Sequence, residues 1–552
     1  MDFPIIRRPR KPDPNWDPHH NPVTNGFAYR IPHSPELSLP GGGNWVVQKY
    51  GGTSVGKFPV KIAEEIVGPG IKRHRIAVVC SARSTGTKSE GTTTRLLRAA
   101  RDVEDVKSRK YLEIVEAIRT DHIEAGRRDV LTERNDAEDV LQHYEQVVNS
   151  ECDDLLDILK SAQVIREVSD QTMDMIVAVG ERLSCLYMTA ILRSRGIKAA
   201  YVDMSEVLAI SSTKASRRGE GLYELLTAAM AKRVLAEPDD AVPVITGFFG
   251  RVQDGLLKEI GRGYTDLCAA LVGIGLEAKE LQIWKEVDGI FTADPSKVPT
   301  ARLLDSVTPS EAAELTFYGS EVIHNETMDQ VIKAEIPIRI KNVKNPRSNG
   351  TVIVPDQTDN YNRRPGFIFR DRSSTNILMQ NQQVPRKPTA VTIKKGIAIL
   401  NVHSKKRTRA HGFLSRIFST LDEHGLSVDL ISSSEVHISL ALHSEARLLS
   451  GGGEEEMKIE SAALQACVED LRTWGDIDLV PNMAIISLVG RHLRSHVGIS
   501  GRFFSALGEH GVNIEMISQG ASEINISCVI EAKEAERALN VVHTNLFTFL
   551  EN

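Results

Sequence analysis

The stretch WVVQKYGGTSVGKFP, residues 45–59, passes from an apolar run to paired glycines and then to hydroxyl and lysine side chains. The apolar run predicts a buried strand, and the glycines predict a tight turn before a helix. GGTSVGK fits the first seven positions of the P-loop pattern, but Phe58 stands where a magnesium-binding hydroxyl belongs. The stretch is therefore an altered P-loop, an accident of glycines or a different phosphate cradle.

Downstream of this stretch, β-branched runs alternate with helical patterns, which predicts an α/β domain with a mainly parallel sheet. Residues 95–168 are rich in helix formers and charge, so we expect a helical insertion there. We expect a helix from Glu181 with its carboxylate in the first turn. Strands are predicted in RIAVVCSA, MIVAVG, IKAAYVDM, AVPVITGFFG, LQIWKEVDGIF and IPIRIKNV.

The C-terminal part of the chain contains an internal repeat. AHGFLSRIFSTLDEHGLSVDLIS, from Ala410, realigns on HVGISGRFFSALGEHGVNIEMIS, from His496, and a two-residue slip then aligns EVHIS with EINIS. Each copy is typical of a strand, a glycine-containing loop, a helix and two strands. One compact βαββ module is therefore used twice.

Composition excludes several classes of protein. The 552 residues suggest three or four domains, and 67 basic against 73 acidic residues indicate neither a nucleic-acid nor a membrane partner. Six scattered cysteines without a C-x-x-C pair fit reduced thiols. No apolar run approaches a membrane span and no signal sequence is visible, so we expect a cytoplasmic protein. Nine of the 23 prolines lie in residues 1–43, which predicts a disordered tail.

Three further segments supply groups that suit an anionic substrate. GRGYTD, residues 261–266, offers Arg262, which can fork onto a carboxylate. VGERLS, residues 179–184, offers Glu181, for which helix capping is an equal alternative. WKEVDGIFTADP, residues 284–295, predicts a long loop at the edge where α/β sheets bind ligands.

These segments, with KYGGTSVGK, VVCSARSTGTKSEGTTTRLL, ITGFFG, EAAELTFYGSEVIH and IPIRIKNVKNP, stand in the order and spacing found in aspartate kinases. The doubled module resembles their paired ACT domains. The resemblance covers residues 44–552 and is greatest to the monofunctional fungal form, because no fused homoserine dehydrogenase follows. It implies an amino-acid-kinase three-layer sandwich with two ferredoxin-like ACT modules. The implied order is a tail (1–43), the kinase domain (44–365), a linker (366–390) and ACT domains (391–470 and 478–552).

The resemblance implies MgATP-dependent phosphorylation of the L-aspartate side chain to 4-phospho-L-aspartate, the first step towards threonine and methionine. Lys49 would lie along the transferring phosphoryl group, and Asp266 would organise that lysine and the metal, with no protein metal ligand assigned. Aspartate would be held by Ser54, Thr94, Glu181, Arg262 and Thr265. ATP would contact Lys49, Gly51, Gly52, Ser54, Lys285, Glu286, Phe291 and Ser296.

The sequence departs from the family pattern at the nucleotide site. Many relatives read W-T-D-V and D-P-R in the nucleotide loop, where this chain has Lys285-Glu286 and Ser296. Glu321 replaces a nucleotide-binding lysine, and a glutamate cannot supply a cation near phosphates. Lys333, Lys341 or Lys285 substitutes for it, or the nucleotide sits differently. His324 is a further site candidate, with a structural role as its alternative.

The ACT-like pair implies feedback inhibition by a small amino acid, threonine first and lysine second. Gly412 and Phe413 precede or begin a helix whose N-terminus suits a carboxylate, and Asp429 suits an ammonium. ACT modules pair across subunits, so a homodimer or larger homo-oligomer is expected. The rival hypotheses are another amino-acid kinase, such as a glutamate or acetylglutamate kinase, and an amino-acid-sensing regulatory protein without activity.

Overall fold

The computed structural model describes residues 45–86, 90–131, 133–207, 220–250, 263–317, 330–331, 333–354, 388–404, 412–434, 436–443, 449–452, 455–491, 493, 496–519 and 524–548. The expected tail and most of the expected linker lie outside these residues. The residues from 43 onwards form one compact unit.

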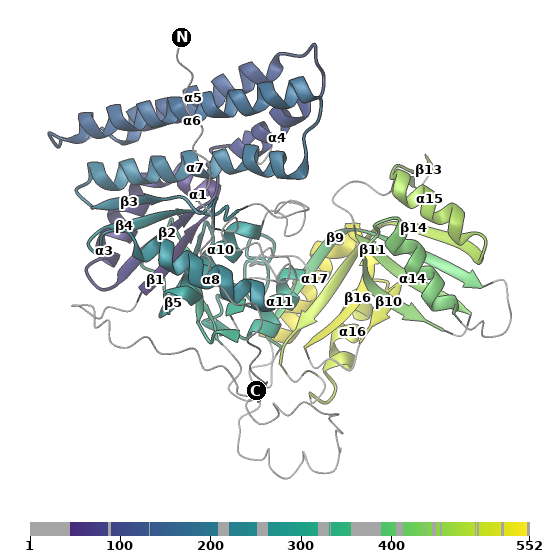
Figure 1. The fold of residues 1–552 in the computed structure, drawn as a ribbon. Helices are drawn as coiled ribbons and strands as arrows, with labels where there is room; N and C mark the ends of the chain where they lie inside the picture. The colour runs from purple at the N-terminus through teal and green to yellow at the C-terminus, as the bar shows by residue number, and fades with distance from the viewer. Residues whose placement is uncertain are drawn as a thin grey trace, which may run out of the picture. The chain divides into compact units, whose positions relative to one another are not determined.

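The N-terminal half is built on a mainly parallel sheet in the order β3-β4-β2-β1-β5-β7-β8-β6 (Figure 1). Only the β7–β8 pairing in it is antiparallel among the described strands. Its strands are β1 (Trp45–Tyr50), β2 (Arg75–Cys80), β3 (Ala199–Val202), β4 (Val242–Thr246), β5 (Glu280–Lys285), β6 (Ser306–Val307), β7 (Ile338–Asn342) and β8 (Thr351–Ile353).

Helices cover both faces of this sheet, so each central strand is buried on both sides. Helix α7 packs on one face and carries α5 and α6 as an outer layer, while α8 and α10 lie on the other (Figure 1). The helices of this half are α1 (Gly52–Lys57), α2 (Pro59–Lys61), the π-helical η1 (Ile62–Val67), α3 (Gly68–Gly70), α4 (Thr92–Asp102), α5 (Lys110–Asp129), α6 (Ala137–Ile165), α7 (Asp170–Ser194), α8 (Glu220–Leu235), α10 (Tyr264–Gly275) and α11 (Pro309–Phe317).

Helix α7 corrects two expectations. The run MIVAVG, predicted as a strand, lies inside this helix, whose first turn is capped by the Ser169 hydroxyl accepting from Thr172 N–H. A short apolar run fits a buried strand and a buried helix equally well, so periodicity could not separate them. By length and composition the helix could also cross a membrane, although the sequence led us to expect no such segment. The 18-residue apolar window that meets this criterion is, however, 83% buried inside the protein. It is a core helix.

The C-terminal half contains a six-stranded antiparallel sheet in the order β10-β11-β9-β14-β16-β15. Its strands are β9 (Ala390–Ser404), β10 (Val428–Ser433), β11 (His437–His443), β14 (Gly475–Val489), β15 (Met516–Ser518) and β16 (Asn525–Glu531), and β12 (Leu449–Gly452) and β13 (Glu455–Ile459) form a hairpin. Its helices are α14 (Phe413–Glu423), α15 (Ala462–Leu471), α16 (Ile499–Glu509), η6 (Ala532–Glu534), α17 (Ala535–His543) and the π-helical η7 (Thr544–Thr548).

The predicted repeat is visible in these elements. Helices α14 and α16 occupy equivalent positions, and their N-cap residues Gly412 and Gly498 share the left-handed conformation, with φ of 83° and 82°. The modules share strands, however. The first part of β9, up to Lys395, pairs with the end of β14, and the remainder of β9 pairs with its beginning. The first part of β9, which the expected ranges put in the first module, thus pairs with a strand of the second module.

Candidate active site

The glycine turn after β1 is shaped by close backbone contacts. A Cβ atom on Gly52 would lie 2.0 Å from the Ala82 carbonyl oxygen, and one on Gly56 would lie 2.1 Å from that of Ser84. A Cβ on Gly51 would meet nothing within 4 Å. Helix α1 begins at Gly52, so GGTSVGK is not a loop, and Lys57 is its exposed last residue. In a P-loop the lysine instead begins the helix, so this turn is a different cradle.

Lys49 and Asp266 form an ion pair at this turn. The Lys49 Nζ lies 2.6 Å from Asp266 Oδ1, and the two side chains are only 12% and 13% exposed. Lys49 is near the end of β1, and Asp266 lies in the first turn of α10. The pair thus holds an ammonium group close to the C-terminal ends of the strands, where open α/β sheets bind ligands.

Glu181 and Thr265 form a second, fully buried pair nearby. The Thr265 hydroxyl donates to Glu181 Oε1 at 2.7 Å. Burial raises the pKa of the Glu181 carboxyl to about 7, against the hydrogen bonds and the positive charge of Lys49, which lower it. Glu181 lies in the middle of α7 and not in a first turn, so the capping alternative is wrong.

The loop after β2 connects this region to the helical layers. Ser84 N–H donates to the Gly52 carbonyl, and Thr92 N–H and hydroxyl both bond the Arg83 carbonyl at the start of α4, which carries Thr94. The Arg83 side chain is 2% exposed and lies 3.2 Å from Asp121 Oδ2 of α5. The helical insertion therefore fixes the loop against which the glycine turn packs.

The register of the strands sorts the lysine candidates by face. Lys49 pairs with Ile283 in β5, so Lys285, two residues further, shares its face. Lys341 pairs with Trp284 and lies over its ring, with Nζ 5.1 Å from the ring centroid, on the opposite face. Burial and Arg339 lower the pKa of Lys341. Of these two lysines, Lys285 therefore lies on the same face of the sheet as Lys49. The third candidate, Lys333, precedes β7 in the chain.

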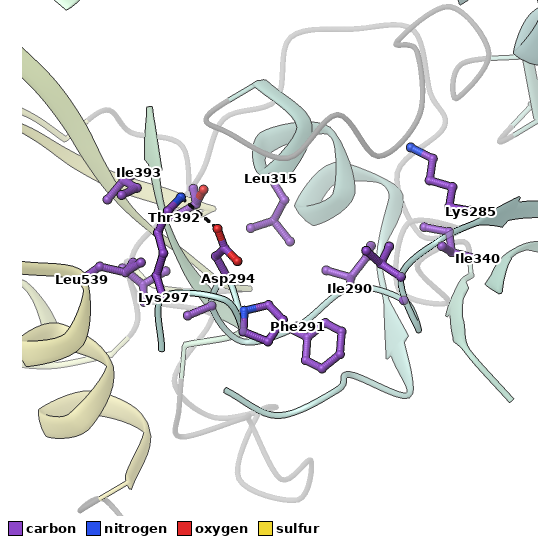
Figure 2. A pocket seen from close by; sticks show the side chains of 15 residues that line it. Lys285, Ile290, Phe291, Asp294, Lys297, Leu315, Ile340, Thr392, Ile393 and Leu539 are labelled. Carbon is purple, nitrogen blue, oxygen red and sulfur yellow. Dashed lines mark ion pairs between the residues drawn. The ribbon is translucent and has the colours of Figure 1, made fainter. Parts of the chain in front are cut away.

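The loop between β5 and β6, residues 286–305, is named the nucleotide loop after the role that the family resemblance implies for it. It lines a cavity of about 290 Å³ together with α11, β7, β9 and α17 (Figure 2). Lys285 and Phe291 contribute to its wall, as do Ile290, Leu315 and Ile340. The sequence had singled out the first two, but nothing in it indicated that Val391, Ile393 and Leu539 from the C-terminal half would complete the wall.

Other candidates in the nucleotide loop make turns. The Ser296 hydroxyl and N–H both bond Asp294 Oδ1, at 2.6 and 3.0 Å, and Lys297 pairs with the same carboxylate at 2.8 Å (Figure 2). Asp288 accepts from the side-chain amides of Asn342 and Asn345. Glu286 directly follows β5. Arg262, Glu321 and His324 lie outside the described residues.

The three regulatory candidates differ in environment: Gly412 and Phe413 lie at the start of α14, whereas Asp429 lies in β10. Gly412 caps α14, Phe413 begins it, and space is open around Gly412. Asp429 is 3% exposed and lies 2.7 Å from Lys394 Nζ. Its carboxylate is therefore already neutralised, and an incoming ammonium would compete with that lysine.

Comparison with known proteins identifies the family. A model described as the amino acid kinase family matches residues 44–342, and one described as an ACT domain matches residues 486–546. An aspartokinase of Candida albicans is 47% identical over an alignment of 527 positions, which covers 93% of this chain and 92% of that protein. The chain belongs to the aspartokinase family. The expected resemblance is confirmed.

Solved aspartokinase structures have the same architecture. Escherichia coli aspartokinase III in complex with aspartate and ADP, in the R-state, matches with a TM-score of 0.66 at 25% identity, covering 91% of this chain and 99% of that one. The same enzyme with lysine and aspartate, in the T-state, matches with a TM-score of 0.67 at 26% identity and the same coverage. The expected fold class, a kinase sandwich followed by ACT modules, is confirmed.

Proposed function

We propose that this aspartokinase transfers the γ-phosphoryl group of MgATP to the side-chain carboxylate of L-aspartate, giving 4-phospho-L-aspartate and ADP. The observation that carries the proposal is the Lys49–Asp266 ion pair beside the buried Glu181–Thr265 pair. Family membership supports the choice of substrate, since the Escherichia coli relative was solved with aspartate and ADP.

Charge neutralisation is the main demand of this reaction, because an anionic carboxylate attacks an anionic phosphate. Lys49 supplies a cation at the glycine turn, and Asp266 holds its amino group in one direction. The Gly51 and Gly52 backbone and Ser54 would bind phosphate oxygens. No side chain needs to remove a proton, because the attacking carboxylate is already ionised at neutral pH.

Recognition of aspartate would use groups of opposite charge. The ionised Glu181 takes the α-ammonium, Thr265 and Thr94 orient the substrate, and Arg262 binds the α-carboxylate. Since the pKa of Glu181 is about 7 without substrate, the ammonium of aspartate favours the ionised carboxylate and binding releases a proton near neutral pH. A substrate longer by one methylene, such as glutamate, would misplace the attacking carboxylate.

The nucleotide would extend from the glycine turn over Lys285 towards Phe291, with Glu286 and Ser296 in the same loop. Mg²⁺ enters with ATP as part of the substrate. We expect phosphate oxygens and water to supply most of its ligands. Asp266, which pairs with Lys49, would help to orient that complex.

The pathway and regulation form the finer part of the proposal. The product would lead to threonine and methionine in the cytoplasm, and threonine, or alternatively lysine, would inhibit through the ACT modules of a homo-oligomer. Gly412, Phe413 and Asp429 are the candidate contacts. The Escherichia coli enzyme with bound lysine in the T-state supports a regulatory amino acid in this family.

A coupled ADP-release assay tests the proposal. Full-length protein with MgATP should release ADP with L-aspartate and far less with L-glutamate, and added threonine or lysine should slow it. Folded protein that shows no aspartate-dependent ADP release would overturn the enzyme assignment and favour an amino-acid-sensing protein. Equal or faster release with glutamate would favour another amino-acid kinase.

A further inference from the structure

His543, the last residue of α17, contacts the nucleotide loop from the regulatory half of the chain. Its ring is fully buried. Nε2 lies 2.9 Å from the Thr292 hydroxyl, and Nδ1 lies 3.2 Å from the Thr300 hydroxyl. Since these threonines precede and follow the turn around Asp294, one imidazole connects the two limbs of the loop.

Both ring nitrogens of His543 have a hydroxyl partner, so either neutral tautomer donates one hydrogen bond and accepts the other. Burial lowers the pKa of His543, which favours the neutral ring. The Thr292 hydroxyl oxygen also accepts the Arg302 N–H, at 2.9 Å. The ring stacks on Phe547 with 4.9 Å between centroids and 6° between planes. A displacement of either limb of the loop would break one of these two hydrogen bonds.

Other contacts between the nucleotide loop and the C-terminal elements surround this ring. Asn540 Nδ2 donates to the Lys297 carbonyl, and Arg302 Nη2 donates to the Phe547 carbonyl, at 3.0 and 2.7 Å. Val391 N–H donates to the Thr292 carbonyl at 2.9 Å. Ala293 and Val298 are buried within the core of the second module. The loop is thus packed and hydrogen-bonded to that module.

The same short segment reaches the cavity beside Lys285. Phe291 immediately precedes Thr292, and Ala293 and Asp294 immediately follow it; all three line the cavity, as does Leu539 of α17 (Figure 2). A displacement of Thr292 would therefore move the wall that the proposed function assigns to ATP. The two hydrogen bonds from the buried His543 ring oppose such a displacement, because a displaced loop would leave a buried ring nitrogen without its partner.

We propose that His543 is a positioning residue for ATP, which acts through Thr292 and Thr300 by holding the nucleotide loop in its binding conformation. This inference rests on the proposed function, because it takes the loop to contact ATP. It assigns to α17, in the regulatory half of the chain, an indirect role in nucleotide affinity. It also predicts that substitutions at His543 alter ATP binding more than aspartate binding.

Conservative variants of the full-length protein separate positioning from stability. His543→Leu removes both hydrogen bonds, whereas His543→Gln places an amide near the Nε2 position and retains a partner for Thr292. Ser527→Ala is the matched control, because the buried Ser487–Ser527 hydroxyl pair lies in the same module and no hydrogen bond among the described residues joins it to the nucleotide loop. For each protein we would measure the KM values for ATP and aspartate, the Kd for MgATP by calorimetry, and the Tm.

We expect His543→Leu to raise the KM and the Kd for ATP by about tenfold, as expected for lost buried hydrogen bonds, with the aspartate KM within about twofold of wild type. His543→Gln should recover most of the ATP affinity. Ser527→Ala should lower the Tm without changing either constant.

Two results would overturn the inference: an unchanged Kd for MgATP in His543→Leu, or an equal loss of MgATP affinity in Ser527→Ala.

If His543→Leu fails to fold, Thr292→Val and Thr300→Val remove the same hydrogen bonds from the kinase side and should raise the Kd for MgATP. An unchanged Kd in both of these variants would likewise overturn the inference. The calorimetry does not require turnover. A wild-type protein that binds ATP but shows no aspartate-dependent ADP release would therefore reject the proposed function and leave this test intact.

Discussion

The Lys49 ammonium lies 2.6 Å from the Asp266 carboxylate, at the point where β1 and α10 converge. Both side chains are mostly buried, so each charge depends on the other for compensation. The pKa of the Glu181 carboxyl is raised by burial, and the positive charge of Lys49 lowers it in part. Asp266 thus holds the Lys49 ammonium at the end of the sheet, where the proposed reaction needs a cation.

Replacement of Lys49 should abolish turnover. Lys49→Met removes the cation that offsets phosphate charge, and we expect kcat to fall by about 1,000-fold, the scale seen for lost electrostatic stabilisation. Lys61→Met is the control, since Lys61 bonds only the exposed Lys344 carbonyl and Glu65 among the described contacts. The ADP-release assay measures both. Substantial activity in Lys49→Met would remove this lysine from the mechanism.

The aspartate KM should depend on pH through Glu181. Below its pKa of about 7 the carboxyl is protonated and cannot hold the α-ammonium, so the KM for aspartate should rise as pH falls, approaching about tenfold per pH unit. Above about pH 8 the KM should become constant. Steady-state kinetics from pH 5.5 to 8.5 test this expectation. A KM that stays flat down to pH 5.5 would contradict the assigned role.

The ionised Glu181 carboxylate should lower the free energy of unfolding at high pH. Its pKa rises from 4.5 in the unfolded chain to about 7 in the fold, so the folded state binds the proton more tightly. The free energy of unfolding therefore falls as pH rises from about 4.5 to about 7 and is constant above that. Between pH 5 and 8, wild type should lose about 2 to 3 kcal/mol more than Glu181→Gln. Denaturant unfolding at both pH values measures the difference. Parallel losses in the two proteins would show that the carboxyl is not perturbed.

The paired glycines should respond differently to alanine. In Gly52→Ala the new Cβ would overlap the Ala82 carbonyl, and we expect a loss of about 1–3 kcal/mol of stability and weaker ATP binding. Gly51→Ala meets no atom within 4 Å, and its φ of −71° suits alanine, so its stability should be close to wild type. Thermal unfolding and the ATP KM compare them. Equal behaviour of the two variants would contradict the packing described.

Feedback inhibition should depend on Asp429. Asp429→Asn removes the charge proposed to bind an ammonium and releases Lys394, so we expect the inhibitor concentration for half-inhibition to rise by about tenfold. We would measure this concentration from dose-response curves with threonine and with lysine. Each rate is expressed relative to the uninhibited rate of the same variant. Ser527→Ala again serves as the control in the regulatory half. Unaltered curves for both amino acids would exclude Asp429 from the regulatory site.

Local patterns predicted much of the architecture. The β-branched runs that become β1, β2 and β4 and the glycine turn before α1 follow from residues near in sequence, as does the repeat that becomes α14 and α16. Prediction failed at α7, because MIVAVG is compatible with a strand and its helical state depends on Ser169 capping and on packing between the sheet and α6.

The sequence by itself determined which residue types were present: a lysine before paired glycines, a Thr-Asp pair and a glutamate in an apolar run. Only the tertiary structure decided their partners, bringing Asp266 to Lys49 and Thr265 to Glu181. It alone brought His543 to the nucleotide loop. The physical reason is that local propensities act over a few residues, whereas ion pairs and buried hydrogen bonds join groups that only chain packing brings within 3 Å.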